Sequence, residues 1–337
     1  MIKQALVSVI IVGHDSKNDL RECLTSLKAS SYRNFETLFV DNCSTDGSAG
    51  FVKREFPWVK VVQNRDNIGY GGGCNVGAKY AQGDFFVFLN PDTRVDRNWL
   101  KELLKVATAD KRIGACGSTV LFWNGKIIQS LGGVYNRETG YSLDLGFGKD
   151  RTGYRLNRLK SFFHCCGVSL LVRAEVFRKV NGFANDYFLY FDEVDLCWRI
   201  RLIGYQVFSV PSSVVYHKIS FKRAHSAKYR YLIEKNSLET LIKNYELLNL
   251  VKYGSLVIFI RLVACVLLAI KGKNSYSLAI LKSFVYVVRN FRKIWYNRQR
   301  VQEYRVVTDK DSFKRHFVFP FTSLLHIFRT EVMSFLD

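Results

Sequence analysis

The sequence predicts an α/β protein with an open, doubly wound, mostly parallel sheet flanked by helices and followed by a C-terminal helical extension. Two observations support this fold class. Short apolar runs rich in β-branched residues alternate with helical patterns through the first ninety residues or so. Polar or glycine-rich turns follow several of these runs, at the strand ends where such sheets bind ligands. From about residue 226 the pattern changes to long helices.

The first strand is expected over 6–12, where a continuous apolar run is typical of a strand buried on both faces. A helix from Asn18 to Ala29 follows, with apolar residues at helical spacing. The remaining elements come in the same alternation. We expect strands over 35–40, 59–63, 84–89, 167–172 and 213–216, and helices over 48–56 and ending over 77–81.

The net charge and the cysteine content limit the kinds of function and of cellular compartment that we expect for this chain. Of the 337 residues 48% are hydrophobic, which suffices for a folded core, and the net charge is +21. Residues 217–337 carry 22 basic and 8 acidic side chains, so this part should bind something negative: nucleic acid, an anionic membrane or a phosphorylated substrate. The eight cysteines form no C-x-x-C pair, and no signal peptide is visible. We expect reduced thiols in the cytosol; a redox-active Cys165–Cys166 pair is the alternative.

Two apolar runs, over 254–270 and 276–288, are bordered by lysine and arginine. At ~1.5 Å per residue the first reaches about 25 Å, less than the roughly 30 Å hydrocarbon core of a bilayer. This length predicts a helix lying in the membrane interface, flanked by Lys252, Lys271 and Lys273, instead of one that spans. The alternative is an ordinary buried pair of helices.

Three carboxylates lie within four residues at Asp192, Glu193 and Asp195, among aromatic and apolar neighbours. In a cleft, partial desolvation and mutual repulsion would raise at least one pKa toward the range of a general base. Acidic residues also favour the first turn of a helix, which needs no catalysis.

Residues 64–77 hold five glycines within nine residues, between a strand and a helix. Backbone N–H groups there could approach a diphosphate closely. The segment matches neither G-x-x-x-x-G-K-[ST] nor G-x-G-x-x-G, which disfavours P-loop hydrolysis and nicotinamide cofactors. Asp41, directly after a strand, could accept a hydrogen bond from the imide N–H of uracil or thymine.

Asn90-Pro-Asp92 ends another strand and offers an amide and a carboxylate, which are ligands of Mg²⁺ or Mn²⁺. His217, 22 residues after Asp195, could add its imidazole to the same metal. The alternatives are a plain turn at 90–92 and a structural histidine.

Together these motifs resemble glycosyltransferase family 2, especially its rhamnosyltransferase-like branch. Seven segments occur in the family's order: 7–12, 40–48, 67–77, 89–92, 182–183, 192–196 and 215–217. The resemblance covers roughly 5–225. It implies a GT-A fold, a nucleotide-sugar donor, a divalent metal (Mg²⁺ or Mn²⁺) and inversion at the anomeric carbon.

Position by position, Asp41 resembles the family's base-binding aspartate and Asp92 the metal-binding end of its D-x-D motif, with Asn90 in place of the first acid. Glu193 takes the place of the catalytic base, but the acidic pair is reversed, so Asp192 is the other candidate. The resemblance also suggests further site residues. For the nucleotide sugar these are Val12, Asn67, Gly69, Gly71 and Asn75, and for the acceptor side Gly167 and Asp195.

The resemblance implies a catalytic domain over 1–225, with a nucleotide-sugar half to about 110 and an acceptor half beyond it, and a basic extension over 226–337. The expected enzyme is a metal-dependent inverting hexosyltransferase. It would use dTDP-rhamnose or a UDP-hexose, and a glycan or lipid-linked acceptor, in cell-surface polysaccharide or glycoprotein glycan synthesis. We expect it in the cytoplasm, peripheral on the inner membrane face, without nucleic acid; a homo-oligomer is left open. A paired-carboxylate hydrolase is the enzymatic rival. The non-enzymatic rival is a basic membrane- or nucleic-acid-binding protein.

Overall fold

The computed structural model describes residues 4–154, 159–218 and 226–314, and these form two compact units. Unit 1 comprises Met1–Gly133 and Asp144–Ile219, and unit 2 comprises Val134–Leu143 and Ser220–Asp337. The division near residue 220 lies close to the boundary expected from the sequence. The segment 134–143, however, clusters with the C-terminal helices, which sequence order alone does not suggest.

Unit 1 is built on one mixed sheet in the order β10-β12-β6-β11-β4-β1-β2-β3. Its first half is parallel: β1 (Val7–Gly13) lies between β2 (Phe35–Asp41) and β4 (Phe85–Leu89), and β3 (Val59–Gln63) follows β2. The register aligns Gly13 with Asp41 and Asp41 with Gln63. The polar turns after these strands therefore start from the same edge of the sheet.

The second half contains the antiparallel strand β11 (Ser169–Arg173), which pairs with β4 and with β6 (Ile113–Phe122). β12 (Gln206–His217) runs parallel to β6. Three short strands complete the sheet: β5 (Thr93–Val95), β7 (Ile128–Ser130) and β10 (Lys160–Ser161). The expected mostly parallel α/β sheet is confirmed, with β11 running against its neighbours.

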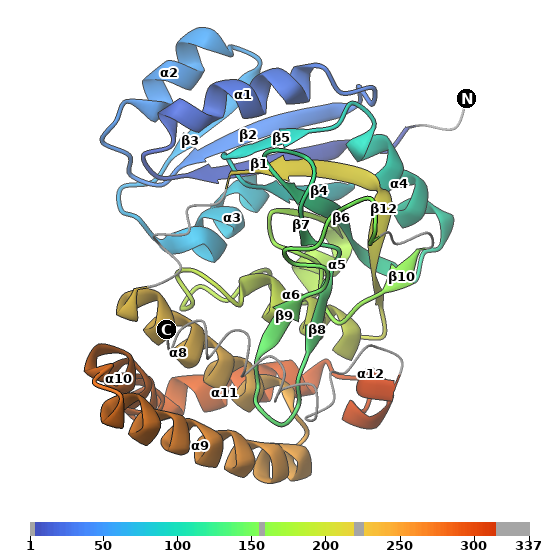
Figure 1. Ribbon diagram of the computed structural model, residues 1–337. Coiled ribbons are helices and arrows are strands. Elements are labelled where there is room, and N and C mark those ends of the chain that lie inside the picture. The colour runs from blue at the N-terminus through green and yellow to red at the C-terminus, as the bar shows by residue number, and fades with distance from the viewer. Residues whose placement is uncertain (1–3, 155–158, 219–225, 315–337) are drawn as a thin grey trace. The chain divides into compact units, whose positions relative to one another are not determined.

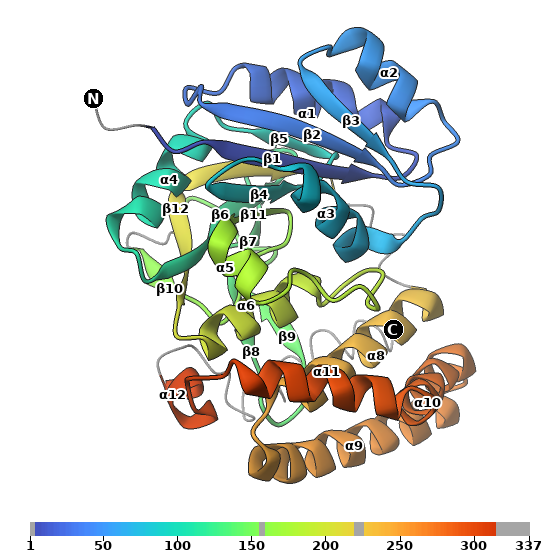
Figure 2. The ribbon, with the colours of Figure 1, turned by 180° about the vertical axis from the view of Figure 1, so that it is seen from behind.

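Helices cover both faces of this sheet (Figures 1 and 2). On one face Val7, Val9 and Ile11 of β1 pack in a single core with α1 (Lys17–Lys28), α2 (Ser48–Glu55) and α4 (Trp99–Ala109). On the other face lies α3 (Gly69–Tyr80). Unit 1 also contains α5 (Ala174–Lys179) and α6 (Asp192–Leu202).

The glycine-rich segment, expected between a strand and a helix, is largely helical: α3 covers Gly69–Tyr80 and ends within the expected 77–81. A Cβ added at Gly73 would lie 2.5 Å from Val12 Cγ1, and one at Gly77 would lie 2.5 Å from Ile10 Cγ2. These glycines therefore let α3 pack directly against β1. Gly69, with φ of +78°, begins the helix.

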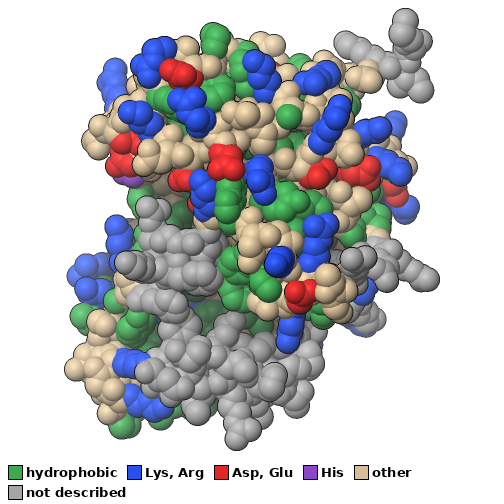
Figure 3. Space-filling model, turned by 45° about the horizontal axis from the view of Figure 1, so that its top comes forward, with side chains coloured by type: hydrophobic (Ala, Val, Ile, Leu, Met, Phe, Trp, Pro, Cys, Tyr) green, Lys and Arg blue, Asp and Glu red, His purple; other side chains and the backbone are tan. Residues whose placement is uncertain are grey.

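Unit 1 has surface charges of both signs, and the cysteines of the chain are reduced, as we expected from the sequence. On the upper part of the face in Figure 3, acidic side chains lie among the basic ones, so this surface carries no single-sign field. All eight cysteines of the chain are free thiols, and both Cys165 and Cys166 are buried. Burial raises the pKa of both thiols well above the usual value, which disfavours the redox-active alternative.

Among its described residues, unit 2 contains five helices and the tip of the β8–β9 hairpin (Gly133–Tyr135 and Ser142–Asp144). The helices are α8 (Ala227–Asn244), α9 (Leu247–Ile270), α10 (Asn274–Arg289), α11 (Phe291–Glu303) and α12 (Asp309–Lys314). α8 packs against α10 and α11 and is buried along most of its length, charged residues included. Its Glu234 lies between Arg230 (Nη2–Oε1 2.6 Å) and Arg261 (Nε–Oε2 2.7 Å) and accepts a hydrogen bond from Tyr141.

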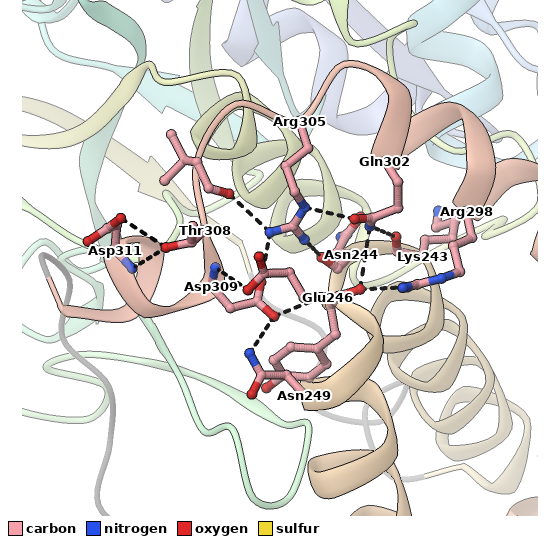
Figure 4. Close-up of polar contacts among 12 residues, drawn as sticks. Lys243, Asn244, Glu246, Asn249, Arg298, Gln302, Arg305, Thr308, Asp309 and Asp311 are labelled. Carbon is pink, nitrogen blue, oxygen red and sulfur yellow. Dashed lines mark hydrogen bonds and ion pairs between the residues drawn. The ribbon is translucent and has the colours of Figure 1, made fainter.

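A second polar cluster ties the α8–α9 corner to α12 (Figure 4). Arg305 donates to Gln302 Oε1 and to Asp309 Oδ1, the latter at 3.0 Å. Asp309 Oδ2 accepts from the backbone N–H of Glu246, and Glu246 Oε2 accepts from that of Asp309, at 2.7 and 2.9 Å. This reciprocal capping satisfies backbone donors at the starts of α9 and α12.

The length argument against a spanning helix is wrong. The apolar run begins at residue 254, but the helix begins at Leu247 and covers 24 residues, about 36 Å. Within the described residues α9 is the one helix long and apolar enough to cross a membrane, and 22% of its most apolar window is buried. Length and composition alone are weak evidence for spanning.

Candidate active site

The turns after β1, β2 and β3 form a polar edge around Asp41. Its side chain is only 3% exposed; Oδ1 accepts from Ser44 N at 3.2 Å and Oδ2 from Gln63 Nε2 at 3.5 Å. These two N–H donors occupy only part of the carboxylate's hydrogen-bond acceptor sites. Asp41 can therefore still accept a hydrogen bond from an N–H group of a ligand. Val12, also expected here, is buried against Gly73.

Asn42 organises the glycine-rich turn, although nothing in the sequence singled it out. Its Nδ2 donates to Asn67 Oδ1 at 3.1 Å and to Gly69 O at 2.9 Å, and its Oδ1 accepts from Asn64 Nδ2 at 3.0 Å. Asn67 Oδ1 also accepts from Gly69 N at 3.1 Å. Asn67 thus holds the start of α3, and its side-chain oxygen is already engaged within the protein.

The start of α3 meets the acidic segment. Tyr70 N donates to Phe188 O at 2.7 Å, and a Cβ at Gly69 would collide with the Phe188 backbone. A Cβ at Gly71 would lie 2.5 Å from Asp192 Oδ1. The structure therefore brings the expected diphosphate-binding turn and the expected base together, from positions more than a hundred residues apart.

The acidic residues lie in the first turn of helix α6, as the helix-start interpretation expects. Phe188, Tyr190 and Phe191 immediately before it have φ of +66°, +69° and +66°. Left-handed backbone is costly for bulky side chains, on the order of 1 kcal/mol or more each, and such strain gathers at functional sites. This turn delivers Asp192 buried (1% exposed) and Glu193 partly accessible to solvent.

Glu193 has the electrostatics of a general base. Burial raises its pKa from 4.5 to about 7; its own backbone N–H opposes the shift, and the charge of Asp144 adds to it. A Cβ at Gly167 would lie 3.4 Å from Glu193 Oε2, and Tyr70 donates from its hydroxyl to Gly167 O at 3.0 Å. Gly167 therefore lies directly against the Glu193 side chain. A carboxyl with a pKa near neutrality can take up a proton efficiently there.

Asp92 and His217 meet where β5 pairs with the end of β12. His217 Nε2 lies 3.1 Å from Asp92 Oδ1 and 3.5 Å from Asn90 Nδ2. On the other side of the ring, Gln129 Oε1 lies 2.8 Å from Nδ1 and accepts the Nδ1 proton. With Nδ1 bonded to Gln129, the other ring nitrogen, Nε2, faces Asp92. Asp92 Oδ1 is buried, and its close polar neighbour is this ring nitrogen.

A divalent cation fits this arrangement. An imidazole nitrogen and a carboxylate oxygen face one another here at 3.1 Å, and both are groups that coordinate divalent cations. The described residues contain no group of three His, Cys, Asp or Glu side chains that could hold a metal. Asp92, His217 and the Asn90 amide would therefore form a partial ligand set, of the kind that leaves positions for water and diphosphate oxygens.

Two expected site residues lie elsewhere. The Asn75 side chain donates to Phe183 O and to Asn185 Oδ1, and it accepts from Phe183 N. Asn75 also lines a cavity of about 830 Å³ beside α3. Asp195, expected on the acceptor side, is 0% exposed and pairs with Arg199 at 2.7 Å. Arg199 in turn donates to Val180 O and Gly182 O. Both side chains hold the turn before α6 in place.

Known proteins resemble this chain in sequence and in fold. The model of the family "Glycosyl transferase family 2" matches residues 8–180, just over half of the chain. An N-acetylglucosaminyl-diphospho-decaprenol L-rhamnosyltransferase of Mycobacterium tuberculosis is 28% identical over 66% of this chain and 77% of its own length. Rhamnosyltransferase WbbL of Escherichia coli is 24% identical over 69% of this chain and 95% of its own. A longer, uncharacterised protein of Sinorhizobium fredii is 28% identical over 65% of this chain, which spans a quarter of that protein.

Among solved structures, the mannosyltransferase PcManGT of Pyrobaculum calidifontis, in complex with GDP-Man and Mn²⁺, has a TM-score of 0.55 over 90% of this chain and 87% of its own, at 15% identity. The shared fold is GT-A, as the sequence predicted. Family match, rhamnosyltransferase relatives and fold agree: this chain belongs to glycosyltransferase family 2.

Proposed function

We propose that this glycosyltransferase transfers a sugar from a nucleotide-diphosphate donor to a glycan or lipid-linked acceptor with inversion at the anomeric carbon. dTDP-rhamnose is the favoured donor and a UDP-hexose the alternative. The rhamnosyltransferase relatives support the sugar. Asp41 supports a uracil or thymine base, because its carboxylate can accept the imide N–H. The products would enter cell-surface polysaccharide or glycoprotein glycan synthesis.

The observation that carries the proposal is Glu193, a carboxyl with a pKa of about 7 beside the turn that begins α3. Glu193 removes the proton from the acceptor hydroxyl as its oxygen attacks C1 of the donor sugar. The bond between C1 and the phosphate oxygen breaks, and the nucleoside diphosphate leaves with that electron pair. One displacement inverts the anomeric carbon and needs no second carboxylate as nucleophile, unlike a retaining hydrolase.

Asp92 and His217, with the Asn90 amide, would hold Mg²⁺ or Mn²⁺. When bound, such a cation neutralises the charge that develops on the leaving diphosphate. Backbone N–H groups at the start of α3, near Gly69 and Gly71, would bind the same phosphates. Gln129 holds the His217 ring so that Nε2 faces Asp92.

Release of nucleoside diphosphate from dTDP-rhamnose and from UDP-sugars, with and without a lipid-diphosphate-linked N-acetylglucosamine acceptor, tests the proposal. We expect acceptor-stimulated release with dTDP-rhamnose and an inverted anomeric configuration in the product by NMR. A product that retains the donor's configuration would refute the single displacement. Release from no nucleotide sugar under any metal condition would refute the enzyme assignment.

The excess of basic residues in the C-terminal part supports action at the inner face of the cell membrane, where a lipid-linked acceptor would be presented. The non-enzymatic alternative leaves the raised pKa of Glu193 and the Asp92–His217 pair without a role. A homo-oligomer remains compatible with both.

A further inference from the structure

The helical hairpin α9–α10 exposes an apolar face. On α9 the residues that pack inward form one stripe (Gly254, Val257, Arg261 and Cys265), and α10 packs alongside, with Ser277 Oγ donating to Cys265 O at 2.9 Å. The opposite side of α9 is also apolar and open to solvent. Its exposed residues are Leu248, Val251, Phe259, Leu262, Val263, Val266 and Ile270, of which Phe259 is 64% exposed and Ile270 76%. α10 adds Leu278, Leu281, Val285 and Val288.

These side chains form a stripe and are not scattered. Positions 248, 251, 259, 262, 266 and 270 recur with helical periodicity, away from the buried Arg261 and Cys265, and the exposed Ser255 interrupts the row. A single exposed leucine on a protein surface needs no explanation, but an apolar stripe from 248 to 270 does.

Charge indicates what covers this stripe. Between Leu247 and Gln302 there is no Asp or Glu, whereas there are ten Lys and Arg. Several of the basic residues are exposed at the ends and sides of the hairpin, among them Lys252, Lys271, Lys282, Arg289 and Arg292. A face that is apolar at its centre and exclusively basic at its edge matches an anionic bilayer, with acyl chains beneath and phosphates around.

Unit 2 itself disfavours a spanning α9. Arg261, in the middle of the helix, is 1% exposed and bonds to Glu234 and to Ser237 Oγ of α8. Crossing the bilayer at this depth would carry α8, with its buried charged residues, into the hydrocarbon core. α10, with 16 residues, is about 24 Å long and cannot cross beside it.

We propose that the exposed face of α9 and α10 docks on an anionic phospholipid bilayer, with α9 lying in the interfacial plane. This inference extends the lipid-linked acceptor of the proposed function. Vesicles that contain no acceptor test it separately from sugar transfer.

Flotation of the full chain with phosphatidylcholine vesicles, with and without phosphatidylglycerol, at low and high salt, is the experiment. We expect binding to anionic vesicles that salt weakens but does not abolish, because apolar insertion resists salt. The double variant F259S/V266S should bind about tenfold more weakly or worse, whereas F147S, an equally polar change at an exposed phenylalanine of unit 1, should bind like the parent. The charge variant R289E/R292E should lose the salt-sensitive component.

Donor hydrolysis in solution and the urea unfolding midpoint should stay unchanged in F259S/V266S, which separates lost docking from misfolding. A protein that docks without transferring sugar would leave this inference standing and refute the proposed function. Failure to float with anionic vesicles at low salt would overturn the inference. A dimer of the parent that F259S/V266S dissociates would also overturn it, by assigning the face to a second copy of the chain.

The plane of α9 has its own test. A tryptophan introduced at residue 259 (F259W) should be quenched by lipids brominated near the headgroup more strongly than by lipids brominated near the chain end. Stronger quenching from the chain end would overturn the in-plane orientation.

Discussion

Replacing Glu193 by glutamine should stabilise the protein above neutral pH while disabling it. In the folded protein burial raises the pKa of this carboxyl from 4.5 to about 7, so ionisation is more costly there than in the unfolded chain. At 1.36 kcal/mol per pH unit the difference corresponds to about 3 kcal/mol above pH 7. Because the side chain is partly accessible to solvent, water reduces this penalty, and about 1–3 kcal/mol is the expected range.

The sign follows from proton binding. Below about pH 4.5 the carboxyl is neutral in both states, so the penalty is absent; it grows as the pH rises through the interval from 4.5 to about 7 and is complete above it. Glu193→Gln removes the ionisable group and therefore the penalty. The stability of the variant relative to the parent should rise across this interval.

Urea unfolding at pH 5 and at pH 8.5 measures this difference. Glu175→Gln, at a carboxyl whose side chain is 71% exposed, is the matched control and should show no such pH dependence. In parallel, kcat of Glu193→Gln should fall by about 10²-fold or more, with donor affinity nearly unchanged. An equal stability change at both pH values would refute the raised pKa. A dead Asp192→Asn variant beside a nearly normal Glu193→Gln would assign the base to Asp192.

Three further predictions concern the metal and the C-terminal unit. Chelation should abolish transfer and Asp92→Ala should weaken donor binding as well as rate, since the cation holds the diphosphate; full activity in excess EDTA would remove the metal from the mechanism. Gln129→Leu should weaken the apparent Mn²⁺ affinity by about 10- to 100-fold in a titration followed by electron paramagnetic resonance. The control Gln129→Glu keeps the acceptor for His217 Nδ1 and should lose less affinity. Equal affinities in the parent and in Gln129→Leu would contradict the positioning role of Gln129. Arg305→Ala leaves the carboxylate of Asp309, which is 1% exposed, without its guanidinium partner and should lower the free energy of unfolding in urea by about 3–5 kcal/mol. The control Arg300→Ala, at an exposed arginine, should change it little. A loss no larger than that of Arg300→Ala would show that the Arg305–Asp309 ion pair contributes little to stability.

Much of the N-terminal sheet could be predicted because its strands are continuous apolar runs. The bounds expected for the strand over 59–63 match β3 fully; those for β2 and β4 differ by one residue at one end, and those for β1 are shifted by one residue at both ends. In α1 the residues expected to face the core are the ones that are buried. These elements follow from local patterns of period two and 3.6, which tertiary contacts reinforce.

Errors arose where the fold overrides local propensity. Glycine disfavours helix, yet α3 contains glycines at 73 and 77, where a Cβ would collide with Val12 and Ile10 of β1, and it begins at Gly69, where a Cβ would collide with the backbone of Phe188. The start of α9 was missed because Asn249 and Lys252 interrupt the apolar pattern in its first turns. The reciprocal capping of Glu246 and Asp309, 63 residues apart, fixes that start instead.

The site residues missed by sequence reasoning are amides. Asn42 and Gln129 belong to no chemical motif by themselves, and their roles depend on partners distant in sequence: Asn67 and Gly69 for the first, His217 for the second. Asn42 follows Asp41 in a strand-end turn, a position that could have suggested a structural role in the site. Gln129 lies in a short strand with no such signal.

The proposed donor-binding turn and the proposed base are connected through the segment 188–191. The segment 188–191 holds three bulky residues in left-handed backbone conformation, and the contact of Tyr70 N with Phe188 O is one of the bonds that offset this strain. Asp192, at the end of that segment, lies against Gly71, where a larger residue would meet its carboxylate. Phosphates bound at the start of α3 would therefore act on a backbone that also positions Glu193. A base whose position depends on the same turn that receives the donor is best placed when the donor is bound, which favours transfer to the acceptor over proton abstraction in an empty site.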